Sequence, residues 1–313
     1  MVKMDNLRER IYKFFLNAGL FFVVPLAIRL PEGLGRFILK LKAYVRFTIG
    51  SYRSYINRKG LRDIALRNIS QTLNLNERMA RQKIRKLMCL EVIAERNGFL
   101  FDKYDLTSLR RDFDIRGLEI LDRELKRKKG IIFVTIHSGD TVLFMLFLSL
   151  MGYNIYGLFD GAILSSDSTD PLLRFARLKD LKIDGKIGKL YTGRGLRGLF
   201  DVLNSNGIIV WMIDVSPQNT KRIGFVNFLG KEVCVNTSFL EVAIRSGASI
   251  VPFIGSYDLR EDKHKFYIDE PFDTRKGIRE IYAFYEPYVR MNPESWFGWY
   301  YFDTMIKKEV QHV

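Results

Sequence analysis

The chain has few of the residues on which many protein chemistries depend. Its 313 residues include two cysteines, Cys89 and Cys234, and three histidines, His137, His264 and His312. Two cysteines far apart in the sequence give no disulfide framework and indicate a reducing compartment. Neither cysteine has a histidine nearby, and no spacing resembles a metal site. We therefore expect no disulfide, no bound metal and no cofactor.

Several functional motifs are also missing. The sequence has no Walker A motif and no G-x-S-x-G nucleophile elbow, which argues against a P-loop nucleotide site and a serine hydrolase of that type. Residues 193–198 match G-x-G-x-x-G, but residues 189–191 before them make a poor strand. We interpret this segment as the start of a helix and not as a dinucleotide site.

No hydrophobic run is long enough for a clear membrane span. Residues 14–28 are apolar and aromatic, but they are fewer than the ~20 residues that a span needs, and Pro25 interrupts them. No small-residue cleavage site follows, so the segment is not interpreted as a signal peptide. Residues 1–60 contain twelve Lys or Arg and three Asp or Glu, a net charge of +9 out of +15. An apolar segment between basic flanks predicts an interfacial or re-entrant anchor, with the basic residues at the headgroups of an anionic membrane surface.

This region has two other interpretations. The first is an ordinary helix that packs on the protein's own core. The second is nucleic-acid binding, which is not expected because the aromatic residues form one apolar block and do not alternate with Lys and Arg.

What the chain does have is the composition of a globular protein, with 47% hydrophobic and 27% charged residues. Residues 62–73 place apolar side chains on one side of a helix, and Asn76 is a candidate cap for the next helix. From about residue 115, short apolar runs alternate with helical stretches, and they lie at 131–136, 153–159, 208–213 and 250–255. This pattern predicts an α/β fold with a mainly parallel or mixed central sheet flanked by helices.

We divide the chain into a basic, helical, membrane-associating region, 1–110, and an α/β domain, 111–313.

Three of the expected strands end in an ionisable residue. His137 follows the first run, Asp160 the second and Asp214 the third. Side chains at the carboxyl ends of parallel strands converge on one edge of the sheet, where α/β folds bind their ligands. A histidine there is a candidate general base. The plainer interpretation is that an aspartate after a strand is a common turn or capping residue. The stretch 142–151 is apolar on nearly all sides, which predicts a buried helix or one that faces acyl chains.

Motifs across most of the chain resemble one family, the bacterial lipid A biosynthesis acyltransferases, the late enzymes that add lauroyl or myristoyl chains. The resemblance rests on the order of the motifs. They are residues 65–69 and 91–95, His137-Ser138-Gly139-Asp140, Asp214 after Gly207, residues 224–230, Thr237 with residues 246–252, and Pro293-Glu294-Ser295-Trp296.

The resemblance implies a lysophospholipid-acyltransferase-like enzyme that moves an acyl group from a thioester to a hydroxyl or amine. The donor would be an acyl carrier protein or acyl-CoA, and the acceptor a membrane lipid or glycolipid precursor. His137 would be the general base, and backbone amides after it would stabilise the oxyanion. The implied location is the cytoplasmic face of the inner membrane, as a peripheral or monotopic protein. Arg177 matches a family arginine and is a candidate contact for a phosphate or carboxylate on the acceptor.

Two departures from the family bear on its site. The family carries an acid five residues after the histidine, where this chain has Val142. Asp140, three residues after His137, is the nearest substitute for this acid. Asp160 and Asp214 are the alternatives, and both are also candidate contacts for the substrate. Asp140 is equally suited to the N-terminus of a helix. After Trp296 the family's Trp, His and Arg are replaced by the aromatic residues 297–302, to which we assign no catalytic role.

A second function of another class is a catalytically silent lipid- or carrier-binding protein that has kept the fold. The intact His137 favours the enzyme.

Overall fold

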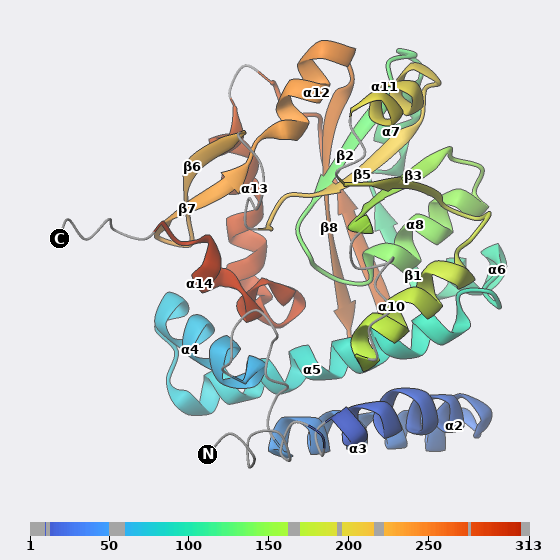
Figure 1. Ribbon diagram of the computed structural model, residues 1–313, viewed down its shortest axis with the longest axis vertical. Helices are drawn as coiled ribbons and strands as arrows, with labels where there is room; N and C mark the ends of the chain where they lie inside the picture. Colours follow the sequence, from blue (N-terminus) through green and yellow to red (C-terminus); the bar gives the residue numbers. More distant parts are fainter. Residues whose placement is uncertain are drawn as a thin grey trace.

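A seven-stranded sheet forms the centre of the protein in a computed structural model, which describes residue 10 and residues 13–49, 60–161, 170–192, 196–215, 222–274 and 277–307 (Figure 1). The strands lie in the order β1 (Phe113–Arg116), β9 (Lys263–Ile268), β8 (Ser249–Asp258), β2 (Ile131–Thr135), β5 (Ile208–Met212), β3 (Ile155–Phe159) and β4 (Gly188–Tyr191). All neighbours are parallel except β8 and β9. The prediction of an α/β fold with a mainly parallel, mixed sheet is confirmed.

The four apolar runs form β2, β3, β5 and β8, close to their expected bounds. The prediction for residues 189–191 was wrong, because they pair with β3 as strand β4. Strands β1 and β9 were not expected, since their apolar residues alternate with polar ones and form no continuous run. A separate hairpin of β6 (Ile223–Phe228) and β7 (Lys231–Asn236) was also not expected as strands. Residues 193–195 of the G-x-G-x-x-G segment and His312 lie outside the described residues.

Helices cover both faces of the sheet. One face packs on α6 (Leu106–Asp112), α7 (Leu118–Leu125) and α8 (Thr141–Leu150). The other face packs on α11 (Arg197–Asn204), α12 (Ser238–Ser246) and α13 (Ile278–Met291), together with α4 (Leu61–Leu73) and α5 (Glu77–Leu100). The all-round apolar character of α8 is explained by burial, since most of its side chains belong to the core. Asn76 caps α5 as predicted, with its side chain 2.9 Å from the amide of Met79.

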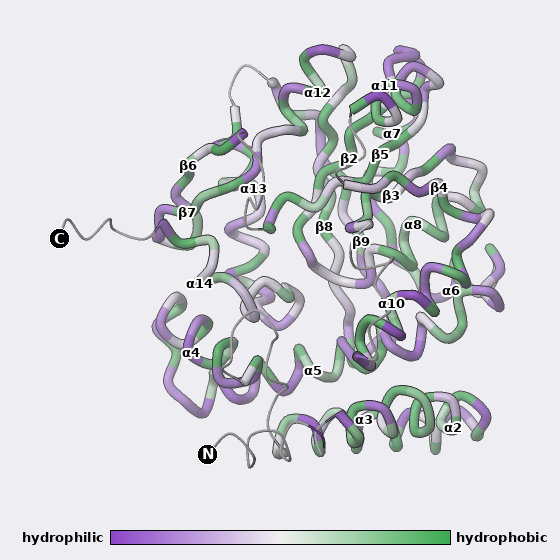
Figure 2. The backbone as a smooth tube through the Cα atoms, in the orientation of Figure 1, coloured by the Kyte–Doolittle hydropathy of each residue, from purple (hydrophilic) through white to green (hydrophobic). Residues whose placement is uncertain are grey.

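The N-terminal helices run along the outer side of α5 (Figure 1). They comprise helical residues 13–18, the π-helical turn η1 (Gly19–Val23), α2 (Val24–Arg29) and α3 (Glu32–Ile49). Lys42 and Arg46 of α3 form ion pairs with Glu95 of α5. These helices expose a series of large apolar side chains. Hydrophobic residues recur along the whole length of α2 and α3 (Figure 2). Within the described ranges, no helix has the length and apolar character to cross a bilayer.

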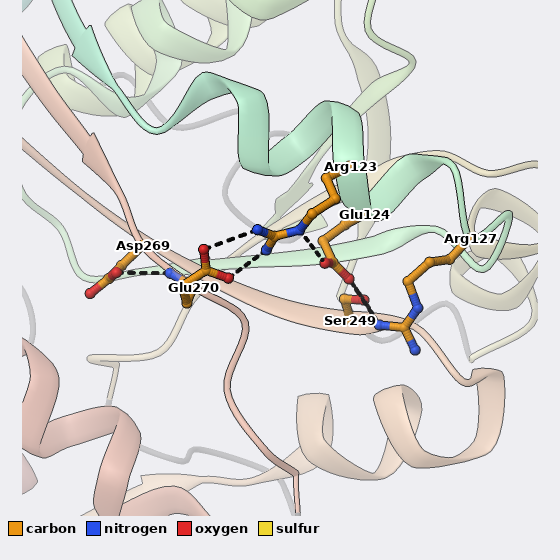
Figure 3. A network of polar contacts seen from close by, with 6 residues as sticks. All are labelled: Arg123, Glu124, Arg127, Ser249, Asp269 and Glu270. Carbon is orange, nitrogen blue, oxygen red and sulfur yellow. Dashed lines mark hydrogen bonds and ion pairs between the residues drawn. The ribbon is translucent and has the colours of Figure 1, made fainter.

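A polar network joins α7 to the start of β8 and to the segment after β9 (Figure 3). Glu124 accepts hydrogen bonds from Ser249 Oγ, at 2.6 Å, and from Arg127 Nη1, at 2.8 Å. Arg123 pairs with Glu270, which follows β9. Ser249 begins β8, so this network stabilises the amino end of that strand.

Candidate active site

The loop that carries His137 leaves β2 at the carboxyl edge of the sheet and enters α8. Gly139 has φ +62°, and a Cβ there would lie 2.8 Å from the carbonyl carbon of Gly255. Only glycine fits that conformation and that approach without strain. The C-terminal turns η2 (Pro293–Ser295) and η3 (Phe297–Tyr300) hold the loop from the other side. The amide of Phe297 donates to the carbonyl of His137 at 2.9 Å, and the amide of Gly139 donates to the carbonyl of Ser295 at 3.3 Å.

The structure pairs His137 with Asp214. Strand β5 lies beside β2, so Asp214 after β5 reaches the loop after β2. Its Oδ1 lies 2.7 Å from His137 Nδ1, and its Oδ2 accepts the His137 backbone amide at 2.9 Å. The Asp214 side chain is fully buried, whereas the His137 side chain is 32% exposed. Because Nδ1 faces the carboxylate and carries the proton, Nε2 is the ring nitrogen left to act as a base.

Two aromatic side chains complete the shell around Asp214. Trp296 Nε1 donates to Oδ2 at 2.7 Å, and the Tyr301 hydroxyl donates to the same oxygen at 3.0 Å. The Tyr301 oxygen also lies 3.1 Å from His137 Nδ1. A buried carboxylate is stable only when its oxygens are hydrogen-bonded, and these donors meet that requirement.

The pair has the electrostatics of a base and its acidic partner. Burial opposes the charged form of His137, but the charge and hydrogen bond of Asp214 outweigh it and raise the His137 pKa above its ordinary value. For Asp214, burial also opposes the charge, yet His137 and the Trp296 hydrogen bond lower its pKa overall. Asp214 therefore stays ionised at neutral pH and stabilises the imidazolium that forms when His137 takes a proton.

Asp140, the substitute suggested by its spacing, makes no hydrogen bond with His137. It caps α8 instead, with Oδ1 accepting from the amide of Leu143 at 3.1 Å. Its Oδ2 accepts from Asn97 Nδ2 at 3.0 Å. The contacts of Asp140 are thus those of a residue at a helix N-terminus. The geometry does not support a catalytic role for it.

The remaining predicted residues lie farther from the pair. Asp160 follows β3, one strand beyond β5 from His137, and it makes no hydrogen bond with His137. Arg177 is half-buried on α10 (Pro171–Lys182), and its contact with an acceptor stays a prediction. One helical turn earlier, Arg174 stacks over Phe21 of the N-terminal helices and bonds Asn17. Among the described residues, no group of His, Cys, Asp and Glu could hold a metal ion.

Trp296 and Tyr301 were not predicted as site residues. In the sequence, Trp296 is only the last residue of the motif Pro293-Glu294-Ser295-Trp296. Tyr301 lies in the aromatic stretch 297–302, to which no catalytic role is assigned from the sequence. An aromatic stretch is more often part of a core, and here most of it is, with Trp299 and Phe302 fully buried. The neighbouring Pro-Glu-Ser-Trp motif was the one available signal that this stretch lies at the site.

Comparisons with known proteins add no identification. No protein-family model matches the chain, and no curated protein matches it in sequence.

Proposed function

We propose that the protein is an acyltransferase that moves an acyl group from a thioester donor to a hydroxyl or amine of a membrane lipid or glycolipid. The single observation that carries the proposal is the 2.7 Å contact between His137 Nδ1 and Asp214 Oδ1 at the carboxyl edge of a parallel sheet. The second support is the order of motifs that resembles the lipid A biosynthesis acyltransferases.

The proposed reaction is one direct transfer. His137 Nε2 takes the proton of the acceptor hydroxyl as its oxygen attacks the thioester carbonyl. The new C–O bond forms, the C–S bond breaks, and the departing thiolate takes the proton from the imidazolium. Asp214 holds the ring by Nδ1 and offsets its transient positive charge, as the acid does in other histidine pairs. No covalent enzyme intermediate and no cofactor are needed.

The site offers few backbone donors for the oxyanion of the tetrahedral intermediate. The amides of Ser138 and Gly139 already donate to carbonyls of Ile136 and Ser295. The amide of Leu143 is used by the Asp140 cap. Those of Thr141 and Val142, in the first turn of α8, have no acceptor in the described part of the chain. They are the donors we assign to the oxyanion, with the α8 dipole behind them.

Asp214 takes the part of the acid that the resembled family carries five residues after its histidine. Val142 fills that position and has no polar side chain. A carboxylate from the next strand serves the same ring nitrogen from another direction, so the variant motif is compatible with base catalysis.

The donor we propose is an acyl carrier protein or acyl-CoA, and the acceptor lies in an anionic membrane at the cytoplasmic face of the inner membrane. The membrane-binding surface is the outer side of residues 13–49. It exposes Phe22 by 68% and Phe37 by 62%, with further exposed apolar residues at Phe15, Leu26, Leu34 and Leu41. Soluble proteins rarely expose so many large apolar side chains in one region. Basic residues on the same helices suit lipid phosphates.

Vesicle flotation tests the membrane surface. We expect the protein to float with vesicles that contain phosphatidylglycerol, and we expect Phe22→Glu with Phe37→Glu to prevent flotation. Ile244→Glu is the matched control, because Ile244 is equally exposed, by 65%, on α12 at the far end of the molecule (Figure 1). Equal flotation of both variants would contradict the assigned surface.

Lipid mass spectrometry tests the reaction. Membranes from cells that express the wild type should contain a lipid heavier by one acyl group, absent with His137→Ala and with Asp214→Asn. Asp140→Asn should retain it. The mass of the heavier lipid identifies the acceptor and the acyl chain that is transferred. If the three variants and the wild type gave identical lipids with donor and acceptor present, the silent binding protein would be the better account.

A further inference from the structure

A pocket of about 430 Å³ is lined by Trp296, the residue whose indole donates to Asp214. Residues of β1, β9 and β8 line it, together with the end of α13 and η2. The His137 side chain does not line the pocket, although its neighbours Ile136 and Ser138 do. Its volume falls within the range of small-molecule sites, about 300–1,000 Å³. The pocket thus adjoins the His137–Asp214 pair, through Trp296 and the two neighbours of His137, without being lined by either member of the pair.

The pocket combines an apolar floor with polar groups that have no partner among the described residues. Ile136, Ile254, Val289 and the Trp296 ring supply the apolar surface. The side chains of Ser256, Asn292 and Ser295 also line it, and within the described ranges they form no hydrogen bond. A few unsatisfied polar groups over an apolar floor are typical of a ligand site.

Two opposite charges stand side by side at the rim. Asp114 and Arg116 are two residues apart on β1, so both point to the pocket face of the sheet. Neither side chain forms an ion pair or hydrogen bond with any other described residue. Lys265, the cation on the neighbouring strand, is already paired with Asp258 at 3.0 Å and with Glu261 at 2.7 Å. Among the residues that the structure describes, the rim thus presents a carboxylate and a guanidinium that are both without a partner, over an apolar cavity.

We infer that this pocket binds a zwitterionic amphiphile, a molecule whose head group carries an ammonium and an anion a few bonds apart and whose tail is an aliphatic chain. Arg116 binds the carboxylate or phosphate, Asp114 binds the ammonium, and the chain lies on Ile254 and Trp296. A molecule with only one charge would leave Asp114 or Arg116 without a partner, so the complete head group binds more tightly. The same chemistry is found in aliphatic amino acids and in phosphoethanolamine lipids. The inference concerns binding alone and does not rest on acyl transfer.

Titration calorimetry of the full chain tests it with probes that share one chain length. At pH 7 the wild type should bind 2-aminooctanoate about tenfold more tightly than octanoate or octylamine, since each of those lacks one charge-assisted contact. Arg116→Ala should weaken 2-aminooctanoate and octanoate by about tenfold and leave octylamine unchanged. Asp114→Asn should weaken 2-aminooctanoate and octylamine and leave octanoate unchanged. Arg110→Ala, an exposed arginine on α6 outside the pocket, is the matched control.

Two further arms complete the test. Ser256→Phe fills the pocket and should weaken all three probes, which separates the cavity from the exposed apolar N-terminal helices. The affinity of hexyl phosphoethanolamine is compared with that of 2-aminooctanoate. Tighter binding of the first indicates a phospholipid head group, and tighter binding of the second indicates an amino acid. Unchanged affinities in both Arg116→Ala and Asp114→Asn, or octanoate binding as tightly as the zwitterion, would overturn the inference. Both substitutions lie at a surface rim, so they remain informative if Ser256→Phe fails to fold.

Discussion

Two sites in this protein use the same residue types, and they have opposite properties. At the first, His137, Asp214 and Tyr301 meet at the sheet edge. At the second, Asn97 of α5 bridges Asp140 and His264, and Tyr104 donates to Asn97 Oδ1 at 2.8 Å. Each site thus has a histidine, an aspartate and a tyrosine within one hydrogen-bonded group.

The difference between the two sites lies in exposure and in what faces the imidazole. His137 keeps a third of its side chain exposed and pairs directly with a carboxylate. His264 is buried among Phe113, Tyr257 and Phe266, its Nδ1 has no partner among the described residues, and burial lowers its pKa. His264 therefore stays neutral and out of reach of a substrate. A histidine near an aspartate becomes a candidate base only when solvent reaches one nitrogen and a carboxylate holds the other.

The strongest test of this comparison replaces each histidine by the same residue. We expect His137→Gln to lower acyl transfer by about 10²–10⁴-fold, because general-base catalysis is lost. His264→Gln should keep activity within a few-fold. Transfer assayed with a radiolabelled thioester donor on membranes measures both, and equal losses in the two variants would remove the distinction between the sites.

The aspartates should separate in the same way. Asp214→Asn removes the charge that stabilises the imidazolium, so we expect a loss of about 10²–10³-fold. Asp140→Asn keeps a good N-cap and an acceptor for Asn97, and should change activity little. The same transfer assay measures both variants. A larger loss of activity in Asp140→Asn than in Asp214→Asn would indicate that Asp140 is the acidic partner of His137.

Stability should also differ between the aspartates. Asp214→Ala leaves the Trp296 indole and the His137 amide without their buried acceptor, and should cost about 3 kcal/mol of unfolding free energy. Asp140→Ala should cost about 1–2 kcal/mol, since it removes one helix cap and one hydrogen bond. Urea unfolding followed by circular dichroism measures both. The reverse order would mean that the Asp214 shell contributes less than its geometry implies.

The pH dependence tests the electrostatics of the exposed site. The base must be neutral, so kcat/KM should rise with pH through a midpoint above about 6.5, the ordinary histidine pKa. Asp214→Asn removes the cause of the raised pKa, and the midpoint of its residual activity should move down. For folding the sign is opposite, because a raised histidine pKa stabilises the protein below that pKa and the contribution is lost above it. A midpoint that stays unchanged in Asp214→Asn would contradict the coupling.

The smallest expected effect concerns the two tyrosines. Tyr301→Phe removes one hydrogen bond to Asp214 and should lower kcat by up to about tenfold, while KM stays unchanged. Tyr104→Phe, the equivalent change at the buried site, should leave kcat unchanged. Steady-state kinetics at saturating donor provides the measurement, and a lower kcat in Tyr104→Phe alone would contradict the assignment of the two sites.

Much of the architecture followed from local patterns. The apolar runs specified four central strands, because strands buried on both faces must be continuously apolar. Asn76 specified the start of α5, since an amide side chain before a helix can bond its first free amides. The alternating strands β1 and β9 and the short β4 were missed, because their stability comes from neighbouring strands and not from their own composition.

The sequence by itself determined that His137 stands at the end of a buried strand, because that position depends only on neighbouring residues. Only the tertiary structure decided its partner. Asp140 is closest in sequence, but the helix cap and Asn97 use both of its oxygens. Asp214 is 77 residues away and becomes the partner because β5 lies beside β2. Trp296 and Tyr301 join them from the C-terminal turns, and such long-range contacts have no local signature in the sequence.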